Sequence, residues 1–172
     1  MHHLITNAAY SKPSGTSWRL CDLHHLGLTV TDIERSITFY RDLLGMTLVR
    51  HRPRVDSGYV SLQTGYPDLV LNVASFKVTP ESSQSLELVQ YMNHAGTSAE
   101  IATNRAGTSH LCLAVSDLHA CYANLQSKGV HFKSTPVTIT AGPNEGGLVV
   151  YFLDPDGYIL ELFQPAAKEQ AA

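Results

Sequence analysis

The stretch His25-Leu26-Gly27-Leu28-Thr29-Val30-Thr31-Asp32 is repeated 85 residues later as His110-Leu111-Cys112-Leu113-Ala114-Val115-Ser116-Asp117. Both copies read His-Leu-x-Leu-x-Val, followed by Thr or Ser and then Asp. Self-similarity of this kind indicates an internal duplication. Later in each half, a strand-like run places a Glu between apolar neighbours, Glu87 in the first half and Glu161 in the second. We therefore expect two similar modules, each with a His and a Glu at matched positions.

The first copy has the two-residue period of a strand with one face on a core, because Leu26, Leu28 and Val30 alternate with less apolar residues. This alternation predicts that His25 points away from that core. It also predicts that the neighbouring His24 points into the core. The second copy has the same phase, so its opening His is expected to have the same orientation as His25.

A helix is expected after each of these strands. Thr31 is predicted to cap the first helix, with Glu34 closing a capping box, and Gly45 to end it. In the second half, Ser116 is the predicted cap and Gly129 the predicted stop. Further strands are expected at 46–54, 68–77, 86–91, 130–133, 148–153 and 158–163, with a short helix or loop at 57–67. The predicted unit is β-α-β-β-β, twice.

The chain has 172 residues, of which 44% are hydrophobic, and this is enough for one sizeable core. We expect a single domain at 20–165, with module one at about 20–92 and module two at about 108–165. Residues 1–19 are rich in Ser, Thr, Asn, Pro and Gly, which predicts a flexible arm. Residues 166–172 are expected to form a tail.

Composition argues against several classes of partner. The 12 Lys and Arg residues nearly balance the 15 Asp and Glu residues, and no basic stripe indicates nucleic-acid binding. No apolar run approaches the roughly 20 residues that cross a membrane. The three cysteines lack Cys-x-x-Cys spacing, so they are most simply reduced thiols. We therefore expect a soluble, cytoplasmic protein that acts on a small molecule, without nucleic-acid or membrane partners.

The matched residues His25, Glu87, His110 and Glu161 predict one shared metal site. A single strand Glu or His is more often a solvated outer-face residue than a ligand. The joint pattern favours ligands, because both pairs occupy the face opposite the helix. Imidazole and carboxylate suit one divalent ion of Zn, Ni, Co, Mn or Fe. Four protein ligands on an octahedral ion would leave two positions for water or substrate, which is a catalytic arrangement.

The chain resembles the vicinal oxygen chelate superfamily, which includes glyoxalase I, methylmalonyl-CoA epimerase, extradiol dioxygenases and fosfomycin and bleomycin resistance proteins. The motifs that carry the resemblance are the two repeated strands, residues 36–46 (Ser-Ile-Thr-Phe-Tyr-Arg-Asp-Leu-Leu-Gly-Met), residues 86–88 and residues 152–162 (Phe-Leu-Asp-Pro-Asp-Gly-Tyr-Ile-Leu-Glu-Leu). The resemblance covers about residues 23–165. It implies an α+β fold in which tandem β-α-β-β-β modules form a cupped, mostly antiparallel sheet around one metal site.

The resemblance also implies a site and a reaction. His25, Glu87, His110 and Glu161 fall on the four positions that glyoxalase I fills with its metal ligands. Thr29 stands where bacterial glyoxalase I has an arginine that holds glutathione, which argues against glutathione adducts as the best substrate. A homodimer is expected, and the modules pair either within one chain or across the two chains.

The leading hypothesis is a metal-dependent lyase or isomerase that acts on a small carbonyl or thioester substrate. It would transfer a proton through a metal-stabilised enediolate, with Glu161 as the principal base and Glu87 as the alternative. One alternative is an Fe(II) extradiol-type dioxygenase. Another is a drug- or metabolite-binding resistance protein without catalysis.

Several residues outside the predicted ligand set are candidates for a role in the pocket. The basic run Arg50-His51-Arg52-Pro53-Arg54 is either a grip for a substrate carboxylate or phosphate, or a solvated edge strand. Cys112 shares the face of His110, and a small buried filler is a simpler interpretation than a nucleophile, because no base partner is evident. Asn72, Tyr91 and Tyr151 are candidates for hydrogen bonds in the pocket.

Overall fold

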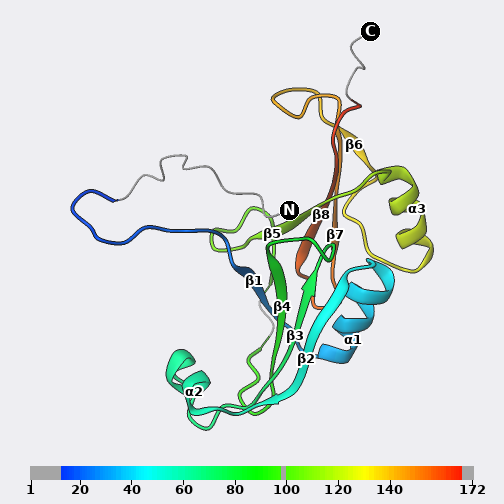
Figure 1. Cartoon of the computed structure of the whole chain (residues 1–172). Helices are drawn as coiled ribbons and strands as arrows, with labels where there is room; N and C mark the ends of the chain where they lie inside the picture. Colours follow the sequence, from blue (N-terminus) through cyan, green and yellow to red (C-terminus); the bar gives the residue numbers. More distant parts are fainter. Residues whose placement is uncertain (1–12, 98–99, 168–172) are drawn as a thin grey trace.

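The computed structural model describes residues 13–97 and 100–167, which form two four-stranded sheets and their helices (Figure 1). Module one contains β1 (His25–Thr29), α1 (Ile33–Ile37), the π-helical segment η1 (Thr38–Leu43), β2 (Thr47–Val55), α2 (Gly58–Thr64), β3 (Leu71–Lys77) and β4 (Ser85–Tyr91). Module two contains β5 (His110–Ala114), α3 (Leu118–Ser127), β6 (Val137–Thr138), β7 (Leu148–Leu153) and β8 (Ile159–Gln164). The predicted α+β class and tandem order are confirmed. None of the described helices has the length and apolar character needed to cross a membrane.

The two sheets have equivalent strand orders, β1-β4-β3-β2 in module one and β5-β8-β7-β6 in module two. In each sheet, the first strand of the module runs parallel to the last, and the other pairs are antiparallel. The register places Gly27 beside Glu87 and Cys112 beside Glu161. Because side chains alternate along a strand, each Glu shares a sheet face with the His that opens the neighbouring strand.

The predicted helix caps are wrong by one residue in both modules. Asp32, and not Thr31, caps α1 by accepting hydrogen bonds from the backbone N–H groups of residues 34 and 35. Asp117, and not Ser116, caps α3 by accepting from the N–H group of residue 120. A carboxylate is as good an N-cap as a hydroxyl. In module one, the Thr31 hydroxyl instead donates to Asp156, which lies in the other module.

A glutamine ties each helix to the last strand of its own module. The side-chain oxygen of Gln90 accepts from the N–H group of Ile33 at 3.3 Å, and that of Gln164 accepts from the N–H group of Leu118 at 2.7 Å. Both glutamines lie near the end of the strand that carries the module's Glu. The duplication therefore extends to the anchoring of the helices.

The edge of the module-two sheet also differs from the prediction. Residues 130–133 do not form a strand but contribute one isolated bridge, between Phe132 and Phe152. Two backbone hydrogen bonds hold this segment to β7. The pairing ends before Pro136, which has no N–H group to donate. The short strand β6 follows and completes the sheet edge.

One buried apolar core spans both modules. It includes Leu28, Ile33, Tyr40, Phe76 and Leu88 from module one and Leu113, Leu118, Leu125, Phe152 and Leu162 from module two. Helices α1 and α3 lie on the same side of the two sheets, and α2 lies on the other side (Figure 1). A smaller core of Val55, Val60, Leu69, Leu71 and Val73 packs at α2. The four predicted ligands lie on strand faces turned away from the shared core.

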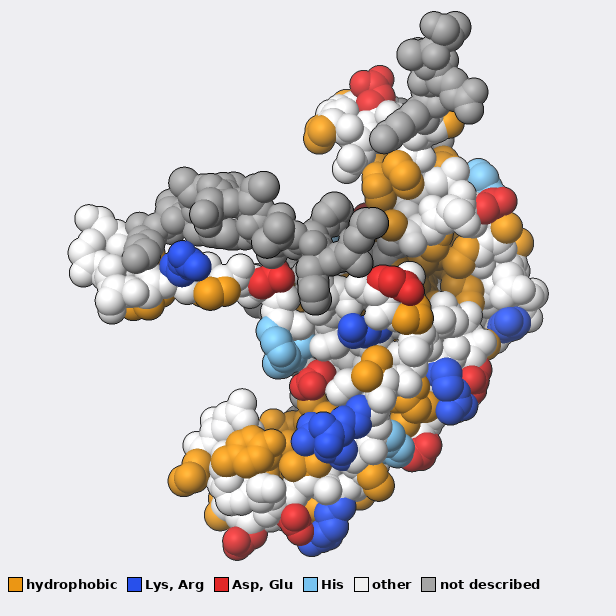
Figure 2. All heavy atoms as spheres, viewed as in Figure 1, with side chains coloured by type: hydrophobic (Ala, Val, Ile, Leu, Met, Phe, Trp, Pro, Cys, Tyr) orange, Lys and Arg blue, Asp and Glu red, His pale blue; other side chains and the backbone are white. Residues whose placement is uncertain are grey.

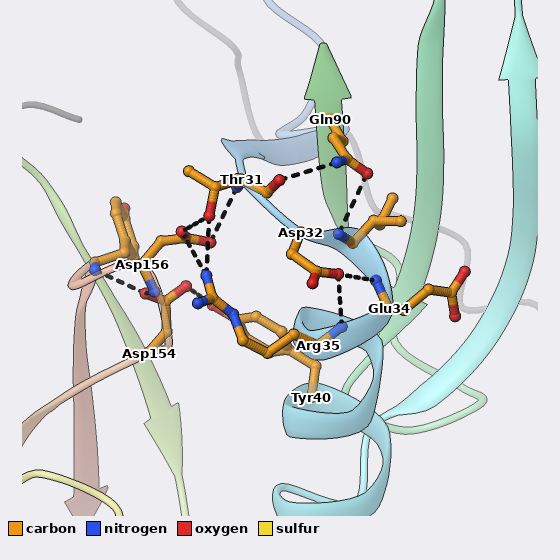
Figure 3. A network of polar contacts seen from close by, with 10 residues as sticks. Thr31, Asp32, Glu34, Arg35, Tyr40, Gln90, Asp154 and Asp156 are labelled. Carbon is orange, nitrogen blue, oxygen red and sulfur yellow. Dashed lines mark hydrogen bonds and ion pairs between the residues drawn. The ribbon is translucent and has the colours of Figure 1, made fainter. Parts of the chain in front are cut away.

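A polar network joins the modules where the β7–β8 turn meets the start of α1 (Figure 3). Asp156 accepts from the guanidinium of Arg35 at 2.7 Å and from the Thr31 hydroxyl. The buried Tyr40 hydroxyl donates to Asp154 at 3.0 Å, and the other oxygen of Asp154 accepts two backbone N–H groups of the turn. Burial raises the pKa of the Asp154 carboxyl. Burial, together with the neighbouring carboxylate, raises the pKa of Tyr40 strongly.

Candidate metal site

The first pair of predicted ligands, here called half-site one, consists of His25 and Glu87. The His25 Nε2 atom lies 3.7 Å from a Glu87 carboxylate oxygen, and the two side chains are 43% and 27% exposed. The hydroxyl of Ser75, which lies beside Glu87 on the neighbouring strand β3, donates to the other carboxylate oxygen at 3.3 Å. Half-site one is therefore a solvent-accessible imidazole–carboxylate pair with one orienting hydroxyl.

The prediction that His24 points into the core is wrong. His24 precedes β1 and is exposed, because the strand that would have fixed its direction begins one residue later. Its ring stands edge-on to that of His25, with the two Nδ1 atoms 2.8 Å apart. This contact occupies the Nδ1 side of His25, so its Nε2 side faces Glu87. A metal-bound imidazole is commonly oriented through its second nitrogen in this way.

The second pair, half-site two, consists of His110 and Glu161. The His110 Nε2 atom lies 2.9 Å from a Glu161 carboxylate oxygen, and the Glu161 side chain is 15% exposed. Tyr151 lies beside Glu161 on β7, interacts with its carboxylate, and packs edge-on against the His110 ring. Tyr151 therefore occupies the position that Ser75 holds in module one.

The Cys112 thiol and the Tyr151 hydroxyl, which lie near Glu161, stay protonated at neutral pH. Partial desolvation and the negative charge of Glu161 raise the pKa of the Cys112 thiol to about 11. The same two causes raise the pKa of the Tyr151 hydroxyl. Because the thiolate is the reactive form of cysteine, a protonated Cys112 thiol argues against a nucleophile. The prediction of a buried filler is wrong, because Cys112 is exposed on the face of half-site two. Tyr151 remains a hydrogen-bond donor to the carboxylate.

The four predicted ligands do not meet within one chain. Among residues 13–97 and 100–167, no group of three or more His, Cys, Asp or Glu side chains is placed to hold a metal ion. Each half-site supplies an imidazole and a carboxylate, which are suitable donors for a divalent ion, but two protein ligands are fewer than metal sites generally use. The expectation of one complete site is therefore not met in the isolated chain.

A cavity of about 200 Å³ lies next to half-site one. Its floor is the sheet face that carries Glu87, and α2 forms a wall. The lining residues are His25, Gly27, Arg52, Val55, Tyr59, Val60, Gln63, Thr64, Leu71, Val73, Glu87, Val89 and Tyr91. In a view of this side, the surface is hollowed above the lobe of α2, where hydrophobic and basic side chains gather (Figure 2).

The other candidate pocket residues divide between the two faces of the module-one sheet. Tyr91 lines the cavity, as expected. Asn72 does not, because it lies on the opposite face and its side-chain oxygen pairs with His51 Nε2 at 2.9 Å. The places of Ser75 and Arg52 beside half-site one could have been found from the sequence only by first deriving the pairing of β2, β3 and β4. Ser75 pairs with Glu87 and Arg52 with Val73 in that register.

Comparisons with known proteins agree with this architecture. A lactoylglutathione lyase of Haemophilus influenzae is 31% identical over 142 residues, which cover 81% of this chain and 90% of that protein. A lactoylglutathione lyase of Arabidopsis thaliana is 28% identical over 140 residues, which cover 81% of this chain. The match covers 43% of the Arabidopsis protein, so the chain corresponds to less than half of that relative.

A solved structure of a glyoxalase family protein from Bacillus cereus has a similar fold. Its TM-score is 0.76 at 16% sequence identity, and the match covers 88% of this chain and 98% of that one. At this identity the likeness concerns the fold alone. The model of one protein family matches residues 22–162, which include both modules and all four candidate ligands. The chain therefore belongs to the glyoxalase/bleomycin resistance protein/dioxygenase superfamily.

Proposed function

We propose that this protein is a divalent-metal-dependent lyase or isomerase of a small carbonyl or thioester substrate. The observation that carries the proposal is the matched construction of the two half-sites. In each, a His Nε2 faces a Glu carboxylate, and a hydroxyl side chain on the neighbouring strand orients that carboxylate. Two such pairs together form the donor set of two imidazoles and two carboxylates that divalent ions accept.

Two copies of the chain are proposed to complete each site. Half-site one of one copy would face half-site two of the other, and the two-fold symmetry of a homodimer would generate two identical sites. The incomplete half-sites support this arrangement, because His25 and His110 remain 43% and 44% exposed in the single chain. The shared core between the modules also opposes a rearrangement that would bring the four ligands together within one chain.

The proposed chemistry is the removal of one proton from the carbon next to the substrate carbonyl, which gives an enediolate, and the return of that proton to a carbon of the enediolate. A bound divalent ion would polarise the carbonyl oxygen and so acidify the neighbouring C–H group. Glu161 is the proposed principal base, which accepts this proton and returns it to the substrate. Its lower exposure, 15% against 27% for Glu87, limits the access of water to the transferred proton. Tyr151 would keep the Glu161 carboxylate oriented during the transfer.

The named relatives suggest a test substrate, the hemithioacetal of methylglyoxal and glutathione, because two of them are named lactoylglutathione lyases. The proposal is that another substrate is preferred. Thr29 is exposed at the end of β1, on the face of half-site one, and brings no positive charge to the position where a glutathione-holding arginine was expected. The loss of one charged contact costs about 1.5–3 kcal/mol, roughly tenfold or more in binding.

A subunit-complementation experiment tests the shared site. One chain carries His25→Ala with Glu87→Ala, the other carries His110→Ala with Glu161→Ala, and two different affinity tags without histidine select the heterodimer. If the sites span two chains, the heterodimer has one intact and one doubly damaged site, so it should bind about half the metal of the parent. Each variant homodimer should bind almost none.

Two outcomes would contradict the proposal. Metal absent from the heterodimer but present in the parent would place each site within a single chain. Parental metal content in both variant homodimers would show that these four residues are not the ligands. The parent assayed against hemithioacetals, CoA thioesters and catechols, with solvent deuterium exchange as a readout, tests the reaction class.

A further inference from the structure

Arg52 lies inside the cavity beside half-site one. In the β2–β3 register Arg52 pairs with Val73, and Val73 pairs with Val89 of β4, the strand that carries Glu87. Val89 in turn pairs with Thr29 of β1. The four residues therefore form one row across the sheet, on the face of half-site one. Arg52 occupies the end of this row farthest from β1, and its side chain is among those that line the cavity.

The Nε–H group of Arg52 is buried and has no hydrogen-bond partner in the described part of the chain. Four other arginines of the protein have a carboxylate partner for the guanidinium group. These are Arg35, Arg41, Arg54 and Arg105, each with a carboxylate oxygen at 2.9 Å or less. An unsatisfied buried donor on a charged group is costly. The unpaired Arg52 donor in the wall of a cavity therefore suits a hydrogen-bond acceptor that comes from outside the chain.

The surroundings of Arg52 define the chemistry of that partner. Arg52 is the only Lys or Arg among the described lining residues, and Val73, Val89 and Leu71 provide apolar walls around it. A guanidinium pairs with a planar carboxylate through two parallel hydrogen bonds. A phosphate dianion carries two negative charges, and the wall offers the positive charge of one guanidinium. A carboxylate on a short apolar chain fits best.

The position of Arg52 sets the size of that ligand. β2 lies two strands from β4 in the sheet, a separation of about 10 Å between strand axes. The long arginine side chain shortens the remaining gap to Glu87. A compact molecule could therefore reach half-site one with its carbonyl oxygen and Arg52 with a carboxylate at its other end.

We infer that Arg52 binds a carboxylate of the substrate, so that the substrate is a carbonyl or thioester compound with a carboxylate at its far end. The inference rests on the proposed function, because it takes half-site one as part of the reacting centre. Arg52 would act as a specificity-determining residue, which positions the substrate and takes no part in proton transfer. It also supplies, from β2, a positive charge that Thr29 does not supply from β1.

Two metal-binding probes of equal chain length test this role. Succinic acid monohydroxamate and butyrohydroxamate both bind divalent ions through adjacent oxygens, and only the first carries a carboxylate at its far end. Their dissociation constants are measured by calorimetry on the protein reconstituted with Co²⁺. The parent should prefer the succinic probe by about tenfold to a hundredfold, the usual range for a charge-assisted bidentate pair.

The variants separate Arg52 from general charge effects. Arg52→Gln should lose this preference and keep its affinity for butyrohydroxamate, and Arg52→Lys should retain part of the preference. The matched control is Arg54→Gln, because Arg54 lies on the same strand but outside the cavity and is paired with Asp56 at 2.9 Å. The control should keep the parental preference.

Two results would overturn the inference. The first is an equal preference for the succinic probe in the parent and in Arg52→Gln. The second is tighter binding of 3-phosphonopropionohydroxamate than of the succinic probe, which would assign the cavity to phosphate. If the first result is accompanied by a weakened dimer in Arg52→Gln, Arg52 is assigned to the subunit interface.

A metal-free readout keeps this inference separate from the proposed function. If no hydroxamate binds to any variant, the metal site is refuted. Arg52 is then tested on chelator-treated protein, which holds no metal. There, titration with glutarate should shift the ¹⁵N–¹H resonance of the Arg52 Nε group in a saturable way. A resonance that glutarate leaves in place would refute the carboxylate site.

Discussion

Replacement of Tyr40 by Phe should destabilise the protein by about 1.5–3 kcal/mol at neutral pH, the usual contribution of a hydrogen bond to a charged group. The Tyr40 hydroxyl donates to Asp154 at 3.0 Å, and the two residues are 0% and 6% exposed. The substitution removes only the hydroxyl, so the ring packing is kept. It leaves one buried carboxylate oxygen without its side-chain donor, while the other oxygen keeps two backbone donors.

The destabilisation should depend on pH in both directions. The hydrogen bond from Tyr40 lowers the pKa of Asp154, against the stronger upward effect of burial. The variant should therefore have a still higher pKa at Asp154, and the difference from the parent should shrink as acid protonates the carboxyl. Above pH 10, Tyr40 ionises in the unfolded parent but not in the folded one, because its pKa is raised on folding. The free energy of unfolding of the parent then falls by up to about 1.4 kcal/mol per pH unit through this group, and that of the variant does not.

Urea unfolding followed by far-ultraviolet circular dichroism, from pH 4 to pH 11, measures this difference. The matched control is Tyr122→Phe, because the Tyr122 hydroxyl forms an exposed hydrogen bond with Gln126 at 2.8 Å. The control should change the free energy of unfolding by less than about 0.5 kcal/mol at every pH below 10. A loss in Tyr40→Phe no larger than that of the control, or a loss that stays constant over the whole pH range, would refute the reasoning.

Three further predictions concern the site. Glu161→Gln should keep much of the metal and lose about 10²–10⁴-fold in rate, the usual contribution of general acid–base catalysis, whereas loss of solvent deuterium exchange in Glu87→Gln alone would reverse the two roles. His24→Ala should weaken metal binding about 10–100-fold in a competitive chelator titration, because its ring holds the Nδ1 side of His25; unchanged affinity would reduce the contact to simple packing. The glutathione hemithioacetal of methylglyoxal should be a poor substrate because of Thr29, and a kcat/KM of about 10⁷ M⁻¹s⁻¹ or above would contradict this.

The sequence predicted the features that depend on local periodicity. The alternation around His25 and the flanking apolar residues of Glu87 correctly placed both side chains on the face opposite the shared core. The duplication then carried the same result to module two. These predictions succeeded because side chains alternate between the two faces of a sheet, so the orientation of one residue determines that of every other residue in the strand.

Predictions at the ends of elements were less successful. His24 was assigned by extending the strand one residue too far, and Thr31 was assigned as a cap although a tertiary contact with Asp156 engages its hydroxyl. The relative placement of the two modules could not be predicted from the sequence either. It depends on how α1, η1 and α3 pack into one core, and the apolar periodicity of a helix does not say which other module it will meet.

Helix α2 makes the two halves of this duplicated chain unequal. Module two has no helix between its second and last strands in the described residues, whereas α2 forms a wall of the cavity on the module-one face. Under the proposed function, recognition and reactivity could therefore be altered separately: changes along α2 and β2 would change which molecules are accepted and would leave the Glu161 side chain and its strand unaltered. A library of variants confined to residues 52–64 is for this reason the most direct route to redesigning the selectivity of this protein.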